Sequence, residues 1–402
     1  MKQVYDITIV GGGMAGASLA IALSSHGLRI ALIEASPLKV DSVPNYDDRG
    51  IALALGSQRI FAALRTWEGM EEQAEPIRHI HVSEQGGFGF THLDADEEQV
   101  PALGYVITAR NLGAALLARL SRLPDIDIIA PGRVQWVNIE DDLAHIGLQE
   151  QALCARLLVA ADGGNSFVRQ QLCFEVKRRE YGQSAITANI TPGRHHQHIA
   201  YERFTRNGPL AMLPMTQQRC ALVWTVRDEM AGEILSLDEQ QFLERLQQQF
   251  GWRLGRLQRA GKRNSYPLSQ LYVPDAIQHR TAVIGNAAHT LHPVAGQGFN
   301  LGIRDVAALA EVVLQGIQSG EDPGSTTVLQ RYQRWRRKDQ QQVVQLTDAL
   351  VRGFSNDLPP LKLARNLGIL ALEGLPPARH LIARTAMGLT GRLPRLSRGL
   401  SL

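Results

Sequence analysis

The sequence predicts an α/β protein with a nucleotide-binding domain, a second domain inserted into it, and a C-terminal helical extension. Three observations support this prediction. A strand, a glycine-rich turn, a helix and a second strand follow one another between residues 6 and 34. Two more predicted strands, at 156–161 and 281–284, each lead directly into a turn that contains glycine. Residues 186–226, which lie between these two strands, show the alternation typical of strands in a sheet.

Length and composition fit a folded chain of two or three domains. The chain has 402 residues, of which 44% are hydrophobic and 20% are charged. Its net charge of +3 gives no reason to expect a nucleic-acid partner. The three cysteines form no paired motif, so we expect a reducing compartment and no bound metal. Since no uninterrupted apolar run reaches about 18 residues, the expected location is the cytoplasm.

The first glycine-rich turn has the spacing of a dinucleotide-binding motif. Gly11, Gly13 and Gly16 form a G-x-G-x-x-G pattern directly after an apolar strand. In such a Rossmann-like unit the first glycine permits the tight turn, the second lets the backbone approach a pyrophosphate, and the third allows the helix to pack closely. The second predicted strand ends at Glu34, which is placed to accept hydrogen bonds from a ribose. This unit does not distinguish NAD from FAD.

Two later motifs add further glycine turns. The strand at 156–161 is followed by Asp162-Gly163-Gly164-Asn165-Ser166 and then Arg169. The strand at 281–284 is followed by the segment 285–300, which opens a helical pattern from Leu301 through Leu314. Glycines at the start of a helix leave backbone N–H groups free, and such a position favours negative charge.

These three motifs, in this order and spacing, resemble those of the single-component FAD-dependent aromatic hydroxylases, and the resemblance covers nearly the whole chain. Within that family the chain is similar to the ubiquinone-biosynthesis branch, on the runs 48–53, 203–215 and 250–255. The implied fold is a Rossmann-like FAD-binding domain with an inserted mixed-sheet substrate domain. The expected ranges are 1–75, 106–180 and 270–350 for the FAD-binding domain, 76–105 and 181–269 for the substrate domain, and 351–402 for the C-terminal helical segment and basic tail.

The resemblance implies FAD as the cofactor and assigns its contacts residue by residue. Most of the family has an aspartate where this chain has Asn286, which keeps a carbonyl acceptor for a ribityl hydroxyl and loses the charge. The other implied contacts are with the adenosine half (Gly11, Gly13, Gly16 and Glu34), the pyrophosphate and nucleotide region (Arg49, Arg110 and Asp162) and the flavin ring (Gly298 and Asn300).

The resemblance also implies the reaction. Reduced flavin and O2 form a C4a-hydroperoxide that hydroxylates an electron-rich ring, with NADPH or NADH visiting as a transient electron donor. A polyprenylated phenol is the implied substrate. Pro293 is assigned to the oxygen-side wall of the site. His292 is a candidate base for the phenol, whereas His289 is expected to be structural.

Two other regions carry expectations of their own. Two proline pairs bracket an apolar pattern over 361–375, which is suited to an interfacial helix or to packing on the body of the protein. Because the tail after Glu373 holds five arginines and no acidic residue, we expect contact with the inner face of a membrane or with other ubiquinone-biosynthesis proteins. His195, His196 and His198 lie in a polar stretch without a nearby carboxylate in sequence, so a solvated turn is expected there rather than a metal site.

Three functions remain open at this point. The first is a monooxygenase of a polyprenylated phenol. The second is a flavin-dependent reductase of isoprenoid double bonds, which would consume no oxygen in forming its product. The third is a non-catalytic binder of prenylated proteins on the same fold, against which the presence of all three cofactor motifs argues. A flavin halogenase is disfavoured because the chain has no Trp-x-Trp-x-Ile-Pro element.

Overall fold

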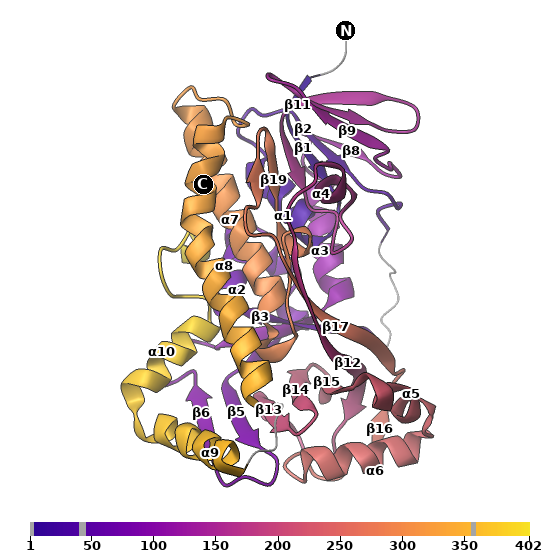
Figure 1. Ribbon diagram of the computed structural model, residues 1–402, viewed down its shortest axis with the longest axis vertical. Helices are drawn as coiled ribbons and strands as arrows, with labels where there is room; N and C mark the ends of the chain where they lie inside the picture. The colour runs from indigo at the N-terminus through magenta and orange to yellow at the C-terminus, as the bar shows by residue number, and fades with distance from the viewer. Residues whose placement is uncertain (1–3, 40–45, 355–358) are drawn as a thin grey trace.

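The computed structural model describes residues 4–39, 46–354 and 359–402. Figure 1 shows a molecule with one sheet at its upper end, a second sheet at its lower end, and two long helices that run along one side between them. This arrangement confirms the predicted α/β fold with two sheet-bearing parts and C-terminal helices.

The upper sheet is the predicted nucleotide-binding unit. Its central strands are parallel in the order β19-β11-β1-β2-β8. Helix α1 joins β1 to β2, and its residues from Gly16 to Leu23 are all buried. Antiparallel strands β18, β10 and β9 extend the sheet. The bounds are β1 Val4–Val10, α1 Met14–Leu23, β2 Ile30–Ile33, α3 Ala109–Leu120, β8 Ile126–Ile129, β9 Trp136–Ile139, β10 Ala144–Gly147, β11 Ala152–Ala160, α4 Phe167–Gln171, β18 Ile277–Gln278, β19 Thr281–Val283 and η3 Gly285–Ala287.

The lower sheet runs in the order β20-β17-β12-β15-β14-β13-β5-β6 and is mixed, because β13 pairs with β5 in parallel while its other pairs are antiparallel. Strands from 79–94 and from 177–272 share it, although the exact domain boundaries remain a prediction. Helix α6 buries Phe242, Leu246 and Phe250 against the outer face of this sheet. The bounds are β5 His79–Glu84, β6 Phe90–Asp94, β12 Lys177–Thr191, β13 Ile199–Thr205, β14 Gly208–Met215, β15 Arg219–Arg227, α5 Asp228–Ser236, α6 Glu239–Phe250, β16 Arg259–Ala260, β17 Asn264–Tyr272 and β20 His289–Thr290.

A small antiparallel sheet, β3-β7-β4, joins the two parts. Its strand β3 contacts both neighbours: Ile51 and Leu53 belong to the upper core, and Gly50 lies against Ala221 of the lower sheet. The bounds are β3 Gly50–Ala54, α2 Leu55–Ala63, η1 Trp67–Gly69, η2 Glu71–Gln73, β4 Glu75–Ile77 and β7 Gly104–Thr108.

Two long helices, α7 (Gln297–Gln318) and α8 (Thr326–Phe354), are held together by a fully buried carboxylate. Asp305 on α7 accepts hydrogen bonds from Arg336 Nε at 2.7 Å and Gln340 Nε2 at 3.0 Å on α8. Its other oxygen lies 2.6 Å from His289 Nε2 on β20. Burial alone would raise the pKa of Asp305, but Arg336 and His289 lower it to about 2.

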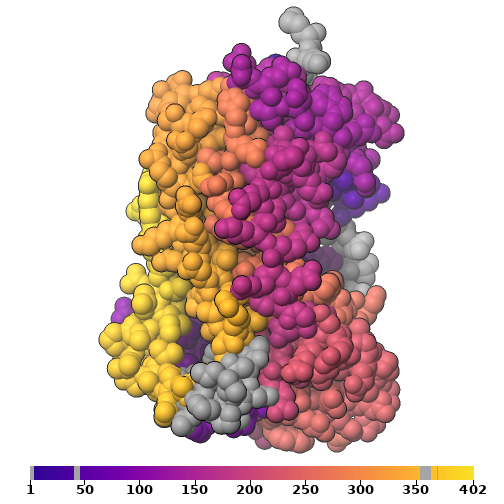
Figure 2. Space-filling view, viewed as in Figure 1, coloured from indigo at the N-terminus to yellow at the C-terminus, as the bar shows by residue number. Residues whose placement is uncertain are grey.

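The C-terminal segment folds back onto the body of the protein. Helices α9 (Pro359–Gly374) and α10 (Pro376–Ala386) pack on the β5–β6 hairpin, and the short η5 helix (Leu396–Arg398) follows. Leu396 is 2% exposed within the main core. In Figure 2 the yellow C-terminal segment lies against the orange helices. Packing of the 361–375 region on the protein is thereby confirmed.

The basic tail is not a solvated end. The backbone N–H of Arg395 donates to Glu311 Oε2 at 2.7 Å, and the guanidinium of Arg392 stacks over Trp335. Its arginines therefore act from a folded surface, and removing the tail would expose core residues. No helix in the described part of the chain combines the length and the apolar character needed to span a bilayer.

We expect Asp305→Asn to lower the free energy of unfolding by about 3 kcal/mol, because the buried Arg336 loses its fully buried counter-charge. In the unaltered protein, the stabilisation by ionised Asp305 is fully present above the pKa of about 3.9 that an aspartate has in the unfolded chain. It is lost as the pH falls through the pKa of about 2 that Asp305 has in the folded protein. Urea denaturation followed by circular dichroism measures this. Asp275→Asn, at an exposed position, is the control. Equal unfolding midpoints for the two variants would contradict the prediction.

Candidate active site

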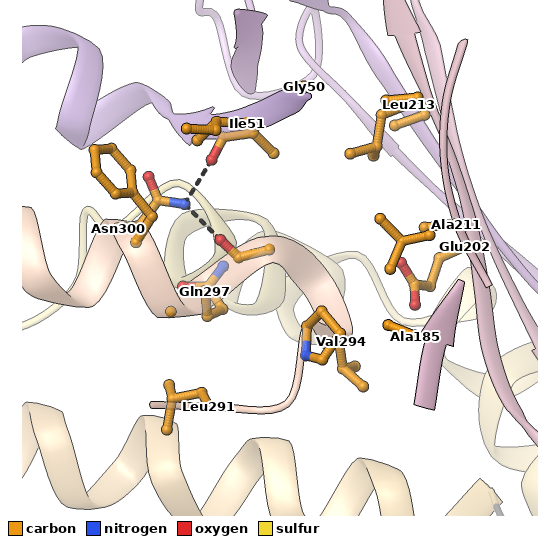
Figure 3. Close-up of a pocket in the computed structure, with 18 of the residues that line it drawn as sticks. Gly50, Ile51, Ala185, Glu202, Ala211, Leu213, Leu291, Val294, Gln297 and Asn300 are labelled. Carbon is orange, nitrogen blue, oxygen red and sulfur yellow. Dashed lines mark hydrogen bonds between the residues drawn. The ribbon is translucent and has the colours of Figure 1, made fainter. Parts of the chain in front are cut away.

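One large cavity, of about 1130 Å³, lies between the glycine turns of the upper sheet and the inner face of the lower sheet. Figure 3 shows the start of α7 on one side of it and the strands of the lower sheet on the other. Its wall also includes residues of α9 and α10. A smaller cavity, of about 240 Å³, lies beside the first turn and is lined by Gly12, Gly13 and the apolar face of α3.

The three motif glycines are required for different structural reasons. Gly11 has φ +105, and a Cβ there would collide with the carbonyl of Ala161. A Cβ on Gly16 would collide with the carbonyl of Gly11. A Cβ on Gly13 would meet no protein atom within 4 Å, because this residue faces the cavity. The chain itself therefore needs the first and third glycines, whereas the second leaves room for a ligand.

Glu34 lies at the carboxyl end of β2, next to this turn. Its Oε2 accepts from the backbone N–H of Gly12 at 2.8 Å and its Oε1 from that of Ser36 at 3.0 Å. A carboxylate has further acceptor positions, which a ribose hydroxyl could use. With the smaller cavity beside it, this region fits the adenosine half of a dinucleotide.

The two arginines that the resemblance assigned to the cofactor differ in position. Arg49 is exposed and lines the large cavity. Arg110, in the first turn of α3, donates from Nε to Asp48 Oδ2 at 2.7 Å and lines neither cavity. The ion pair fixes the segment just before Arg49, so Arg110 is placed to support the site from behind.

The second motif is held to the third by a buried arginine. Arg169 is 2% exposed and donates to Gly164 O at 2.8 Å and to Ala287 O at 2.7 Å. Asp162 accepts from Val168 N through Oδ2, while its buried Oδ1 has no hydrogen-bond partner in the described part of the chain. Asn286 is exposed to the large cavity. Asn286 thus offers an acceptor to the cavity itself, whereas the Oδ1 acceptor of Asp162 lies just behind the cavity wall formed by Ala161 and Gly163.

The N-terminus of α7 faces the cavity without a side-chain cap. Gly296 is its N-cap residue, in the left-handed region at φ +60, and Pro293 and Gly298 line the cavity on either side. The side chain of Asn300 is used within the protein. Its Nδ2 donates to Ala52 O at 3.0 Å and to Gly296 O at 2.7 Å (Figure 3). Its Oδ1 accepts from Ala54 N at 2.8 Å. Asn300 therefore fastens the helix start to β3, and its side-chain donors are already occupied.

The two motif histidines lie behind the cavity wall. His289 is fully buried against Asp305, which confirms its structural role. His292 is also fully buried; it stacks edge-on with Tyr181 and is not among the residues that line the cavity. Burial lowers the pKa of His292 to about 4, so its ring is neutral near pH 7. The structure gives no direct path from His292 to a phenol in the cavity.

The histidine trio differs from the expected solvated turn. His196 is 1% exposed, and Glu75, distant in sequence, lies 2.7 Å from His198 Nδ1. The expectation of a stretch without a carboxylate partner is therefore wrong. Both ring nitrogens of His196 already have partners, since Nε2 lies 3.0 Å from Met215 O and Nδ1 accepts from His198 N. These contacts hold the loop between β12 and β13 against β4.

The chain's own residues fit FAD on three observations. The space at Gly13 matches a pyrophosphate, the buried Oδ1 of Asp162 lacks a donor, and the uncapped N-termini of α1 and α7 direct N–H groups toward the cavity. A dinucleotide site that opens directly into a large, mostly apolar cavity is the arrangement of a flavoprotein oxidoreductase.

Comparisons with known proteins agree with this class. The sequence pattern of the family described as FAD binding domain matches residues 4–347. Ubiquinone hydroxylase UbiL of Rhodospirillum rubrum is 39% identical over 404 residues, which cover 100% of this chain and 94% of that protein. The 3-demethoxyubiquinol 3-hydroxylase of Escherichia coli is 33% identical, with 96% of this chain and 100% of that protein covered.

Solved structures share the fold. The p-nitrophenol 4-monooxygenase PnpA from Pseudomonas putida matches with a TM-score of 0.79 at 18% identity, covering 98% of this chain and 100% of that chain. The chain belongs to the FAD-binding-domain family and is an FAD-dependent monooxygenase of the ubiquinone-hydroxylase group. The predicted cofactor and enzyme class are confirmed, and the reductase and the non-catalytic binder gain no support.

We expect Gly13→Val to fold but to lose FAD, because the new side chain enters ligand space and meets no protein atom. Flavin absorbance per folded protein and the thermal midpoint measure the two effects. Gly232→Val, at a helical glycine whose Cβ also has open space, is the matched control. We expect Gly16→Val to fail in folding instead. A folded Gly13→Val protein with unchanged flavin content would contradict the assignment of Gly13 to the FAD site.

Proposed function

We propose that this monooxygenase hydroxylates the aromatic ring of a polyprenylated methoxyphenol in ubiquinone biosynthesis. The observation that carries the proposal is the continuity of one cavity, which extends from Gly13 and Pro293 to Leu372 and Ile382 on the C-terminal helices. Such a cavity has room for an aromatic ring beside the cofactor and for an isoprenoid chain beyond it. The runs 48–53, 203–215 and 250–255 resemble 2-octaprenyl-6-methoxyphenol hydroxylase, which supports a methoxyphenol ring.

When bound, FAD would accept two electrons from NADPH or NADH and activate O2 for the transfer of one oxygen atom. The residues of the chain position the reactants. Gly13, Glu34, Arg49, Asp162 and Asn286 are proposed to hold the cofactor. Gly11, Gly16 and Arg110 are proposed to keep the surrounding turns in place. The uncapped N–H groups at Gly298 and its neighbours favour negative charge on the flavin ring. Pro293 and the apolar wall exclude water from the reacting centre.

The C-terminal helices support a peripheral membrane position. Leu367 and Leu370 on α9, Leu381 on α10, and Leu375 between the two helices are exposed by 44% to 62%. Large exposed apolar side chains often mark a contact site. Ile382 is both exposed and part of the cavity wall. The end of the cavity therefore lies beside the apolar surface, and we propose that this surface rests on lipid while the isoprenoid chain enters from it.

The reaction is tested with the FAD-loaded protein, NADPH or NADH, and prenylated methoxyphenols of several chain lengths under labelled oxygen gas. We expect product mass to show one labelled atom in the ring. A ring without label, or a reduced prenyl chain, would contradict the proposal.

Pro293→Gly should raise the amount of peroxide released per NAD(P)H oxidised several-fold, since a looser wall admits water. An unchanged ratio of peroxide to NAD(P)H would argue against the assigned role of Pro293.

The membrane surface is tested by Leu375→Glu combined with Leu381→Glu. We expect the fraction bound to anionic vesicles to fall about tenfold or more, because two exposed leucines that would enter the lipid are lost and two negative charges are added. The control is Trp252→Glu, which changes a residue 67% exposed on the substrate domain. Equal cosedimentation of the double variant and the unaltered protein would exclude lipid as the partner and leave a protein partner to be sought.

A further inference from the structure

Glu202 places an acidic side chain in the apolar half of the cavity. It lies on β13, paired with Ala211 on β14 and with Val82 on β5. Figure 3 shows its carboxyl directed into the cavity, near Ala185 and Ala211 and across from Val294. Among the cavity-lining residues contributed by β12 to β15, it is the only one with a carboxyl or basic group.

The carboxyl is without a partner among the residues that the structure describes. No hydrogen bond or ion pair joins the side chain of Glu202 to another residue in the described ranges. The other charged residues of the cavity wall come from different elements, and two of them are already paired: Arg365 with Glu84 and Arg379 with Glu97. The others are Arg49, Lys262 and Asp47, which accepts from the backbone N–H of Lys262. A carboxyl that is surrounded by apolar side chains and aimed into a cavity needs a ligand group to satisfy it.

We propose that Glu202 binds the phenolic hydroxyl of the substrate and holds its proton during hydroxylation, an inference that rests on the proposed function. The O–H bond of the phenol breaks, the proton bonds to a carboxylate oxygen of Glu202, and the electron pair stays on the phenolate oxygen. This charge enriches the ring carbons that receive the oxygen atom. After transfer, the hydrogen on that carbon leaves as a proton and ends in the water formed from the second oxygen atom, while Glu202 returns its proton to the phenolate.

The environment of Glu202 suits this exchange. Burial raises the pKa of Glu202 to about 8. A simple phenol has a pKa near 10, as tyrosine does, so proton transfer to Glu202 is less uphill than transfer to a solvated glutamate with a pKa of about 4.3. Because only the ionised carboxylate accepts the proton, product formation should rise as the pH increases through about 8.

The test compares Glu202→Gln with Glu180→Gln, which removes one charge from an exposed position on the same sheet. We expect both variants to keep FAD. Product formation should fall about 100-fold in Glu202→Gln and stay unchanged in Glu180→Gln. The pH-dependent rise near 8 should disappear from Glu202→Gln. A ring-fluorinated substrate, whose phenol ionises more readily, should narrow the gap between the unaltered protein and Glu202→Gln at least several-fold.

Two results would overturn the proposal: wild-type rates in Glu202→Gln, or the same loss with both substrates, which would indicate a packing role. Glu202→Asp keeps the acid and is expected to retain the pH-dependent rise at a reduced rate; if it folds and lacks that rise, the proposal is also wrong. Failure of the unaltered protein to make labelled product is a separate outcome, because it contradicts the proposed function whatever Glu202 does.

Discussion

The positions of α7, α8 and the turn at 285–290, which surround the cofactor site, depend on the buried carboxylate of Asp305. An ionised group with no exposure to water is tolerated only when its charge and its hydrogen-bonding positions are satisfied, and here Arg336, Gln340 and His289 do so. Arg336 and Gln340 lie on α8 and His289 lies on β20, so with Asp305 on α7 three elements meet at this carboxylate. Because they must meet at one carboxylate, α7, α8 and the turn at 285–290 have little freedom to move independently.

Two further polar contacts extend this constraint to the cavity. Arg169 joins the turns of the second and third motifs through their carbonyl groups, and Asn300 joins the start of α7 to β3. Each of these side chains makes hydrogen bonds to backbone atoms of turns and strands. A buried backbone atom without a partner in a helix or sheet needs such a hydrogen bond. Residues that look like ligand contacts in a motif can thus be the ones that hold the ligand contacts in place.

The sequence predicted features whose signals are local. The G-x-G-x-x-G unit, the parallel strand pattern and the helix after residue 296 depend on neighbours in the chain, and the structure contains them all. The misjudged features depend on partners far away in sequence. Glu75 reaches His198 across 123 positions. The membrane or partner contact predicted for the tail stays a prediction, and the arginine count gave no sign that Leu396 packs in the core. Glu202 was missed because a single acid in an alternating strand carries no motif, and only the pairing of β13 with β5 and β14 brings it to the cavity.

The C-terminal helices connect the chemistry to the physical state of the substrate. Their inner face closes the cavity through Gly368, Leu372 and Ala386, and their outer face exposes leucines. Ion pairs and hydrogen bonds to the β5–β6 hairpin, such as Arg365 to Glu84 and Glu373 to Thr91, hold the pair in place. A helix pair with apolar residues on both faces is costly in water unless each face has an apolar neighbour. Under the proposed function the isoprenoid chain would be the apolar neighbour of the inner face and lipid that of the outer face. The same element would then suit a substrate that is itself a lipid and keep water away from the reacting ring.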